Sequence, residues 1–286
     1  MKIGIIGLGL IGGSLGRAII KRTNDTVYAF DISKKAMLDG KLLTAYHHEL
    51  NKENVCEMDM LFISLYPNAI KGVLNEYCPL LKKGCVVADC CGNKRRVVND
   101  MKALANTYPD LEFISAHPMA GREFSGVAHS TANLFDKASM ILVPVSADIK
   151  SIANFKAYAL SLGFGSVVIT TAKEHDRIIA FTSQLAHLVS SAYIKSDTAT
   201  EFMGFSAGSF RDMTRVARLS SEMWAQLTLD NADFLVGEID SIINSLNQYK
   251  NALETGDYDK MKTLLEDGNQ RKLESERVRR SKTNDK

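Results

Sequence analysis

One histidine in this chain stands among residues that suit a catalytic site. His117 follows the run Glu112 to Ala116, which predicts a strand, and it opens the segment His117-Pro118-Met119-Ala120-Gly121-Arg122-Glu123. Pro118 is expected to stop the strand, and Gly121 lets the loop turn closely. Ligands of open α/β sheets bind beyond the carboxyl ends of the strands, so a histidine there can meet a bound cofactor. The alternative is a structural histidine that is hydrogen-bonded by loop carbonyls.

A glycine-rich turn near the amino terminus predicts a dinucleotide site. It follows the first expected strand and consists of Gly7, Leu8, Gly9, Leu10, Ile11 and Gly12. Gly7 permits a tight turn, Gly9 lets the backbone approach a pyrophosphate, and Gly12 allows close packing of helix on strand. The alternative is a tight turn that binds no ligand.

Asp31 indicates which dinucleotide binds. It ends the second expected strand, nineteen residues after Gly12. A carboxylate there accepts both ribose hydroxyls of NAD and repels the extra phosphate of NADP, so NAD is the expected cofactor. The alternative is that Asp31 merely caps the helix that starts near Ser33.

The second half of the chain carries polar side chains at helical spacing. Ser183, His187 and Ser191 recur every four residues and therefore share one face of a helix. Either they line a cleft between domains, or backbone groups and water satisfy them.

A second cluster lies between Gly204 and Arg215 and includes Gly208. Arg211 and Arg215 are four residues apart on one side of a helix, where two guanidinium groups suit a carboxylate ligand. The alternative is a surface ion pair between Asp212 and Arg215.

The elements that position these residues divide the chain into two parts. Short β-rich runs alternate with helical stretches in the first part, which predicts a Rossmann-type, doubly wound and mostly parallel sheet. The expected strands are 2–6, 27–31, 60–65, 85–89, 112–116, 140–144 and 166–170. Beyond Thr170 only helical periodicity remains, in 174–194, 206–218, 222–249 and 258–277.

A capping box, Thr171-Ala172-Lys173-Glu174, marks the junction between the two parts. We therefore expect an α/β domain over 1–171 and an all-α domain over 172–286, which ends in a charged, solvated tail.

Composition excludes several classes of protein. A net charge of +2 and a pI near 8.2 do not argue for nucleic-acid binding. The five cysteines lack the spacing of zinc or redox motifs, so no metal is expected and the thiols are expected to be reduced. No apolar stretch approaches the length of a bilayer span, and the glycine-punctuated start is not a targeting peptide. We expect a soluble cytoplasmic protein.

The motifs together resemble the prephenate dehydrogenase family of aromatic amino-acid biosynthesis. The resemblance rests on GLGLIGGSLG at the start, HPMAGRE-x-x-G from His117, SQLAHLVS from Ser183, and GFSAGSFRDMTRVA from Gly204 with Met223-Trp224 beyond. It implies an NAD-dependent oxidative decarboxylation of prephenate to 4-hydroxyphenylpyruvate on the route to tyrosine. It also implies a homodimer that pairs through the helical domain.

The resemblance also implies roles for single residues. His117 corresponds to the catalytic histidine, Arg215 to the arginine that binds a substrate carboxylate, His187 to the histidine of the pocket, and Glu123 to its gate. The sequence departs from the family at Gly92, where many relatives carry a serine within Asp-x-x-Ser-x-Lys. Asn93, a backbone amide or water then has to supply the missing hydrogen bond.

Three other functions fit parts of the pattern. Arogenate dehydrogenase performs the same reaction on a substrate with an amino-acid side chain, and the motifs do not separate the two. A β-hydroxyacid dehydrogenase would need a catalytic lysine, for which Lys195 is the candidate, although its surroundings differ from that motif. A non-catalytic NAD sensor would not require both a base and a carboxylate clamp.

Overall fold

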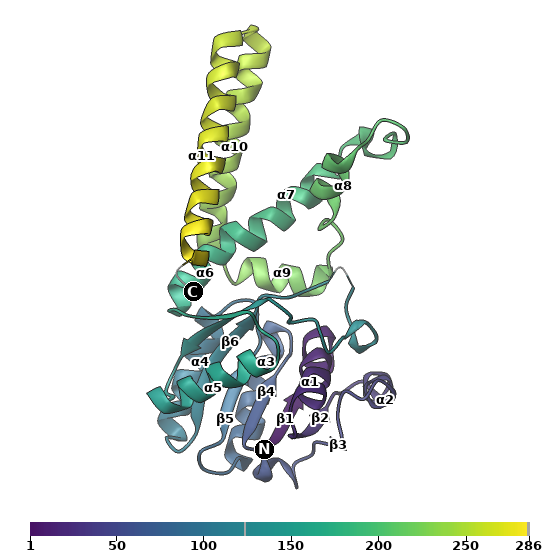
Figure 1. Ribbon diagram of the computed structural model, residues 1–286, viewed down its shortest axis with the longest axis vertical. Coiled ribbons are helices and arrows are strands. Elements are labelled where there is room, and N and C mark those ends of the chain that lie inside the picture. The colour runs from purple at the N-terminus through teal and green to yellow at the C-terminus, as the bar shows by residue number, and fades with distance from the viewer. Residues whose placement is uncertain (123, 285–286) are drawn as a thin grey trace. The chain divides into compact units, whose positions relative to one another are not determined.

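A sheet forms the centre of the first part of the molecule (Figure 1). The computed structural model describes residues 1–122 and 124–284, and the side chains in this range through residue 280. Within these residues eight strands form one sheet in the order β3-β2-β1-β4-β5-β6-β7-β8. β7 runs antiparallel to β6, and the other neighbouring pairs are parallel. The strands are β1 (Lys2–Ile6), β2 (Thr26–Phe30), β3 (His48–Glu49), β4 (Met60–Ile63), β5 (Val86–Asp89), β6 (Glu112–Pro118), β7 (Ser139–Pro144) and β8 (Ser166–Ile169).

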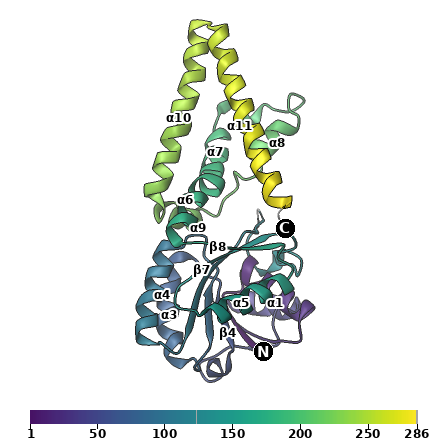
Figure 2. The same cartoon turned by 60° about the vertical axis from the view of Figure 1, so that its left-hand side comes forward.

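Helices cover both faces of the sheet, as Figure 2 shows. On one face, α1 (Leu10–Arg22) and α5 (Ile149–Ser161) pack through residues such as Leu15 and Phe155. On the other, α3 (Pro67–Tyr77) and α4 (Arg95–Thr107) pack through Leu74, Met101 and their neighbours. Because each face of a parallel sheet is apolar, both must be covered. The predicted doubly wound fold is confirmed.

The connections and the second half of the chain are helical. The remaining helices of the sheet region are α2 (Lys34–Leu42) and the short turns η1 (Val55–Glu57), η2 (Cys78–Leu80) and η3 (Val127–His129). After β8 come α6 (Ala172–Ile179), the π-helical turn η4 (Ala180–Leu185), α7 (Ala186–Tyr193), η5 (Asp197–Thr200), α8 (Gly208–Thr214), α9 (Ser221–Leu229), α10 (Ala232–Thr255) and α11 (Tyr258–Asn284). Among the helices described, none is long and apolar enough to cross a membrane.

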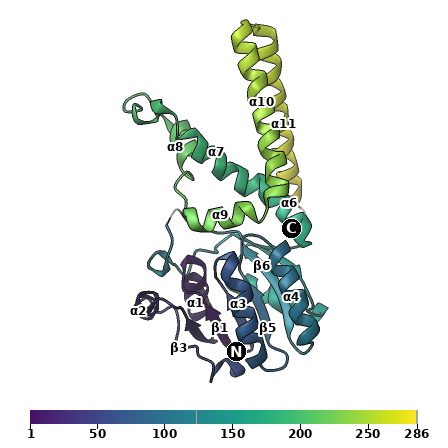
Figure 3. The same cartoon turned by 180° about the vertical axis from the view of Figure 1, so that it is seen from behind.

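Contacts divide the chain into two units, Met1–Phe234 and Leu235–Lys286. The first unit contains the sheet and α6 to α9. In Figure 3, α9 lies above the start of α3, where the Asn68 amide donates to Gln226 Oε1 at 3.2 Å. The second unit is a helical hairpin in which Tyr249 of α10 donates to the Leu264 carbonyl of α11 at 3.2 Å. The predicted domain boundary after residue 171 stays a prediction; Thr171 Oγ1 accepts from the Glu174 amide there, at 3.2 Å.

Several local predictions were wrong for identifiable reasons. Pro118 does not stop its strand: it pairs with Met140 of β7, while β5 ends opposite Ser115, so proline's missing N–H leaves no partner unpaired on that side. The predicted helix 222–249 is split into α9 and α10, because the buried Asn231 turns its side chain inward to bond Asp176 and Gln184. The two-residue strand β3 was missed because it is too short for a periodic signal.

At Gly16, helix α1 lies against the backbone of Ala45, and a substitution there can test this close approach. A Cβ on Gly16 would lie 1.9 Å from the Ala45 carbonyl oxygen. Because backbone atoms cannot yield cheaply, Gly16→Ala should lower the free energy of unfolding by about 1–3 kcal/mol. Gly72 of α3, whose Cβ would meet nothing within 4 Å, is the matched control, and Gly72→Ala should add about 0.5–1 kcal/mol. Urea titrations measure both; equal midpoints would contradict the close approach.

Candidate active site

The glycine turn is shaped as a pyrophosphate site requires. Gly7 has φ +95°, and a Cβ there would lie 2.4 Å from the Ser64 carbonyl oxygen, so only glycine fits. A Cβ on Gly12 would lie 1.9 Å from the Gly7 carbonyl oxygen, whereas one on Gly9 would meet nothing within 4 Å. The side of Gly9 is therefore open, and α1 begins directly after it without a side-chain cap. The first amides of α1 can bind an anion there.

Asp31 fixes this turn from the end of β2. Its Oδ2 accepts from the Leu8 amide at 2.7 Å, and its Oδ1 accepts from the Ser33 amide at 2.8 Å. Ser33, and not Asp31, caps α2, because Ser33 Oγ accepts from the Ala36 amide. Each carboxylate oxygen keeps a second lone pair with which it can accept a ribose hydroxyl.

His117 lies on β6 and contacts a second histidine. Its Nδ1 is 2.9 Å from Nε2 of His175, which stands in the first turn of α6. His175 is only 2 % exposed, and its Nδ1 is 2.7 Å from Asp176 Oδ1. The chain thus brings together an ordered series of three side chains, with the half-buried His117 at its outer end.

The surroundings of His117 keep its ring uncharged. Burial, then the neighbouring His175, then the positive charge of Lys94 hold the pKa of His117 well below the usual value for histidine. Burial also lowers the pKa of His175, against the opposing hydrogen bond to Asp176. His117 is therefore neutral near pH 7, as a proton acceptor must be.

A buried ion pair anchors the backbone beneath His117. Lys94 and Asp89 are both 0 % exposed, and Lys94 Nζ lies 2.6 Å from Asp89 Oδ2. Lys94 Nζ also donates to the Ala116 carbonyl at 2.5 Å, while Asp89 accepts from Ser115 Oγ and from the Cys91 amide. Because this ion pair binds the Ala116 carbonyl and the Ser115 hydroxyl, the residues just before His117 are fixed in place.

Asp176 joins α6 to the start of α4. Besides His175, its carboxylate accepts from the Lys94 amide at 2.8 Å and the Arg95 amide at 2.9 Å. Arg95 Nε adds a contact of 3.1 Å. Burial opposes ionisation, but the hydrogen bonds from His175, Arg95 and Lys94 prevail and lower the pKa of Asp176.

Asn93, expected as one substitute for the family serine, is used elsewhere. Its Nδ2 donates to the Leu227 carbonyl at 2.6 Å, and its Oδ1 accepts from Gln184 Nε2 at 2.9 Å. Gly92 adds no side chain, and a Cβ there would lie 3.1 Å from Leu227 Cδ2. Among the described residues, the ring of His117 meets His175 instead.

The predicted pocket residues of the helices lie in the same unit as His117. His187 Nδ1 is 2.8 Å from the Ser183 carbonyl oxygen, so Nδ1 donates and Nε2 is left for a ligand. The ring of His187 packs on Trp224, with 4.1 Å between centroids.

Gly208 and Arg211 line a separate cavity of about 500 Å³ on α8, and Arg215 follows at the end of that helix. Glu123 lies outside the described residues. Its neighbour Phe124 places the loop after β6 close to the α8–α9 connection, because the Arg218 guanidinium stands 5.5 Å above its ring.

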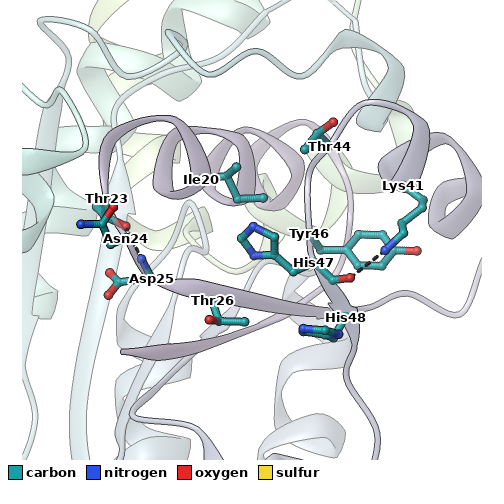
Figure 4. Close-up of a pocket in the computed structure, with 10 residues that line it drawn as sticks. All are labelled: Ile20, Thr23, Asn24, Asp25, Thr26, Lys41, Thr44, Tyr46, His47 and His48. Carbon is teal, nitrogen blue, oxygen red and sulfur yellow. Dashed lines mark hydrogen bonds between the residues drawn. The ribbon is translucent and has the colours of Figure 1, made fainter.

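A larger cavity of about 670 Å³ lies elsewhere (Figure 4). Lys41, His47 and His48 are among its lining residues, and it borders Thr26 at the start of β2, opposite the end that carries Asp31. It therefore does not belong to the nucleotide edge. Among the described residues, no group of three or more His, Cys, Asp or Glu side chains is placed to hold a metal ion.

His175 and Asp176 were missed by sequence reasoning. Both follow the capping box directly, and a histidine and an aspartate that precede the apolar pair Ile178-Ile179 are a signal that could have drawn attention to them. Their partners lie 58 and 82 residues away in the sequence, so no local pattern names those contacts.

These features define a dinucleotide-binding α/β protein with a pair of hydrogen-bonded histidines at its ligand edge. Family models described as "Prephenate dehydrogenase, nucleotide-binding domain" and "Prephenate dehydrogenase, dimerization domain" match residues 15–169 and 171–267. The cyclohexadienyl dehydrogenase of Zymomonas mobilis is 32% identical over an alignment of 269 residues that covers 90% of each chain. The chain belongs to the prephenate dehydrogenase family, and the predicted membership is confirmed.

Two solved structures share the fold at 22% identity. The A. aeolicus prephenate dehydrogenase in complex with hydroxyphenyl propionate and NAD+ has a TM-score of 0.83, over 96% of this chain and 98% of that one. The Synechocystis arogenate dehydrogenase has a TM-score of 0.78, over 96% and 100%. The family model over residues 15–169, and not these two structures, confirms a nucleotide-binding domain in the first part of the chain.

Replacing Asp176 should destabilise the protein strongly. Asp176→Ala leaves the Lys94 and Arg95 amides and His175 without their acceptor, so we expect a loss of about 3–5 kcal/mol in the free energy of unfolding. Asp233, which is 60 % exposed and also pairs with Arg95, is the matched control; Asp233→Ala should cost about 0–1 kcal/mol. Chemical denaturation at neutral pH measures both.

At acid pH, the free energies of unfolding of the wild type and of Asp176→Ala should become more similar. The pKa of Asp176 is lowered in the folded state, so its contribution is complete above about pH 4 and is lost as pH falls through the folded pKa. A loss equal to that of Asp233→Ala at every pH would show that Asp176 holds nothing together.

Proposed function

We propose that this chain catalyses the NAD-dependent oxidative decarboxylation of prephenate to 4-hydroxyphenylpyruvate, a step of tyrosine biosynthesis. The main support is that His117, at the carboxyl end of β6, is neutral and contacts His175. Membership of the prephenate dehydrogenase family supports this substrate. A non-catalytic NAD sensor would not require such a base.

The open side of Gly9 and the first amides of α1 fit the pyrophosphate of NAD. Leu8, Leu10 and Ile11 complete the turn. The Asp31 carboxylate accepts hydrogen bonds from the ribose hydroxyls. NAD, when bound, accepts the hydride that leaves C4 of the substrate ring.

His117 Nε2 takes the proton of the C4 hydroxyl, so the C4–O bond becomes a carbonyl as the hydride leaves. The ring carboxylate then departs as carbon dioxide, and its bonding electrons aromatise the ring. The resulting phenolate recovers the proton from His117. All atoms balance without a metal or a further oxidant.

The helical residues bind and orient the substrate. Arg215 grips a carboxylate by paired hydrogen bonds, with Arg211 as a second cation on α8. His187 presents Nε2 and Ser183 lies beside it on the same helical face, Gly208 contacts the substrate from the start of α8, and Glu123 acts as the gate. These roles come from the family resemblance together with the geometry of α7 and α8.

Two variants separate chemistry from binding. His117→Asn removes the proton acceptor and should lower kcat by roughly 10²–10⁴ with little change in KM. Arg215→Ala removes charge-assisted hydrogen bonds and should raise KM for prephenate by about 10- to 150-fold. Formation of NADH, followed by absorbance, measures both.

Parallel assays with arogenate decide the substrate. A much larger kcat/KM for arogenate would replace prephenate as the substrate, and no NADH from either, while NAD still binds, would favour the sensor. The reverse kinetic pattern in the two variants would mean that the roles of His117 and Arg215 are misassigned.

We also propose that the chain forms a homodimer through its helical region. On α10, Val236, Ile243, Leu246 and Leu253 are exposed at spacings of seven and three residues. An apolar seam of this kind is typical of helices that pair. The second family model is described as a dimerization domain, which supports the view that a second copy of this chain covers the seam.

Light scattering on the purified chain should give twice the 31.5 kDa of one chain. Leu246→Glu places a charge in the seam and should shift the mass to that of one chain at low concentration. Ile149→Glu, at an 87 % exposed position on α5, is the control and should leave the dimer intact. A monomeric wild type, or two dimeric variants, would contradict pairing through α10.

A further inference from the structure

We propose that His175 is a positioning residue that holds His117 in the tautomer with a proton on Nδ1 and a free lone pair on Nε2. The part that concerns catalysis rests on the proposed function. The part that concerns the tautomer follows from the hydrogen bonds of the two rings and from the burial that keeps them neutral.

Asp176 fixes the proton of the neighbouring His175. Its carboxylate accepts from the amides of Lys94 and Arg95 and from Arg95 Nε, so it is ionised and can only accept. His175 Nδ1, 2.7 Å from Asp176 Oδ1, must therefore donate and carry a proton.

The protonation of His175 at Nδ1 determines what its other nitrogen can do. In a neutral imidazole only one nitrogen carries a proton, so His175 Nε2 is a bare acceptor. His117 Nδ1, 2.9 Å away, must then be the donor. Its own single proton is thus placed on Nδ1, which leaves Nε2 as the basic atom.

The charged groups around the pair are already matched with one another. Lys94 pairs with Asp89, and Arg95 pairs with Asp176 and Asp233. Both imidazoles therefore remain neutral between compensated charges, and burial favours that state for both. A protonated His175 would donate from Nε2 and shift the proton of His117 to its own Nε2, but burial lowers the pKa of His175 and favours its neutral ring.

Neither Gly92 nor Asn93 can take the place of His175 beside His117. Gly92 brings no side chain, and both amide atoms of Asn93 bond Leu227 and Gln184. The orientation of the His117 ring consequently depends on a residue of α6, 58 positions further along the chain.

Nitrogen-15 correlation spectra of the full-length enzyme test the tautomer without any substrate. His117 and His175 should both show the Nδ1-protonated neutral form near pH 7, assigned with His117→Asn and His175→Gln. The Nε2-protonated form at His117 would overturn the proposal, whatever the enzyme catalyses.

Kinetics test the consequence for proton transfer. His175→Leu removes the acceptor, so kcat should fall by at least about tenfold, toward the ~10⁴-fold loss known for a catalytic histidine in the wrong tautomer, while KM stays within about threefold. His175→Gln, whose carbonyl oxygen can accept from His117 Nδ1, should recover much of that loss. His47→Leu, which removes a histidine at the far end of β2, is the control and should leave kcat unchanged.

The outcomes separate the two proposals. Wild-type kcat in His175→Leu, or equal losses in His175→Leu and His175→Gln, would overturn the positioning role while the dehydrogenase function stands. A wild type that oxidises neither prephenate nor arogenate would overturn the function, and the spectra would still decide the tautomer.

Discussion

The carboxylate of Asp176 is the group on which the arrangement of the site depends. One buried side chain receives two backbone amides at the start of α4, a guanidinium nitrogen and an imidazole nitrogen. Hydrogen bonds to a charged group contribute about 1.5–3 kcal/mol each, more than a neutral bond. The start of α4 and helix α6 are therefore held together by one ionised carboxylate.

A second buried charge pair shows why this region has one arrangement. Burying Lys94 and Asp89 is costly, and the cost is offset because Lys94 Nζ bonds Asp89 and the Ala116 carbonyl, while Asp89 also accepts from the Cys91 amide. The same dry surroundings raise the pKa of Cys91 to about 11 and that of Cys90 to about 12, so both thiols are uncharged at neutral pH. Any shift of the loop after β5 would leave a charge unpaired.

Local chemistry made much of this structure predictable. The turn at Gly7 and the cap at Thr171 follow from rules that act within a few residues, and the structure has both. The strand through Pro118 and the break at Asn231 escaped because their causes are distant: the end of β5 in one case and two buried acceptors in the other. The residue types of the segment that begins at His117 drew attention to this histidine. Its partner was missed, because nothing near residue 117 indicates a contact with residue 175.

The position of His117 on a paired strand has a consequence for how such a protein changes over evolutionary time. Residues 114–118 are held by the ladder to β7, so the imidazole does not depend on the conformation of the loop that follows. Under the proposed roles, that loop can gain, lose or exchange residues that contact the substrate while His117 keeps its position on β6. Residues that set substrate preference can therefore change without moving the residue that takes the proton.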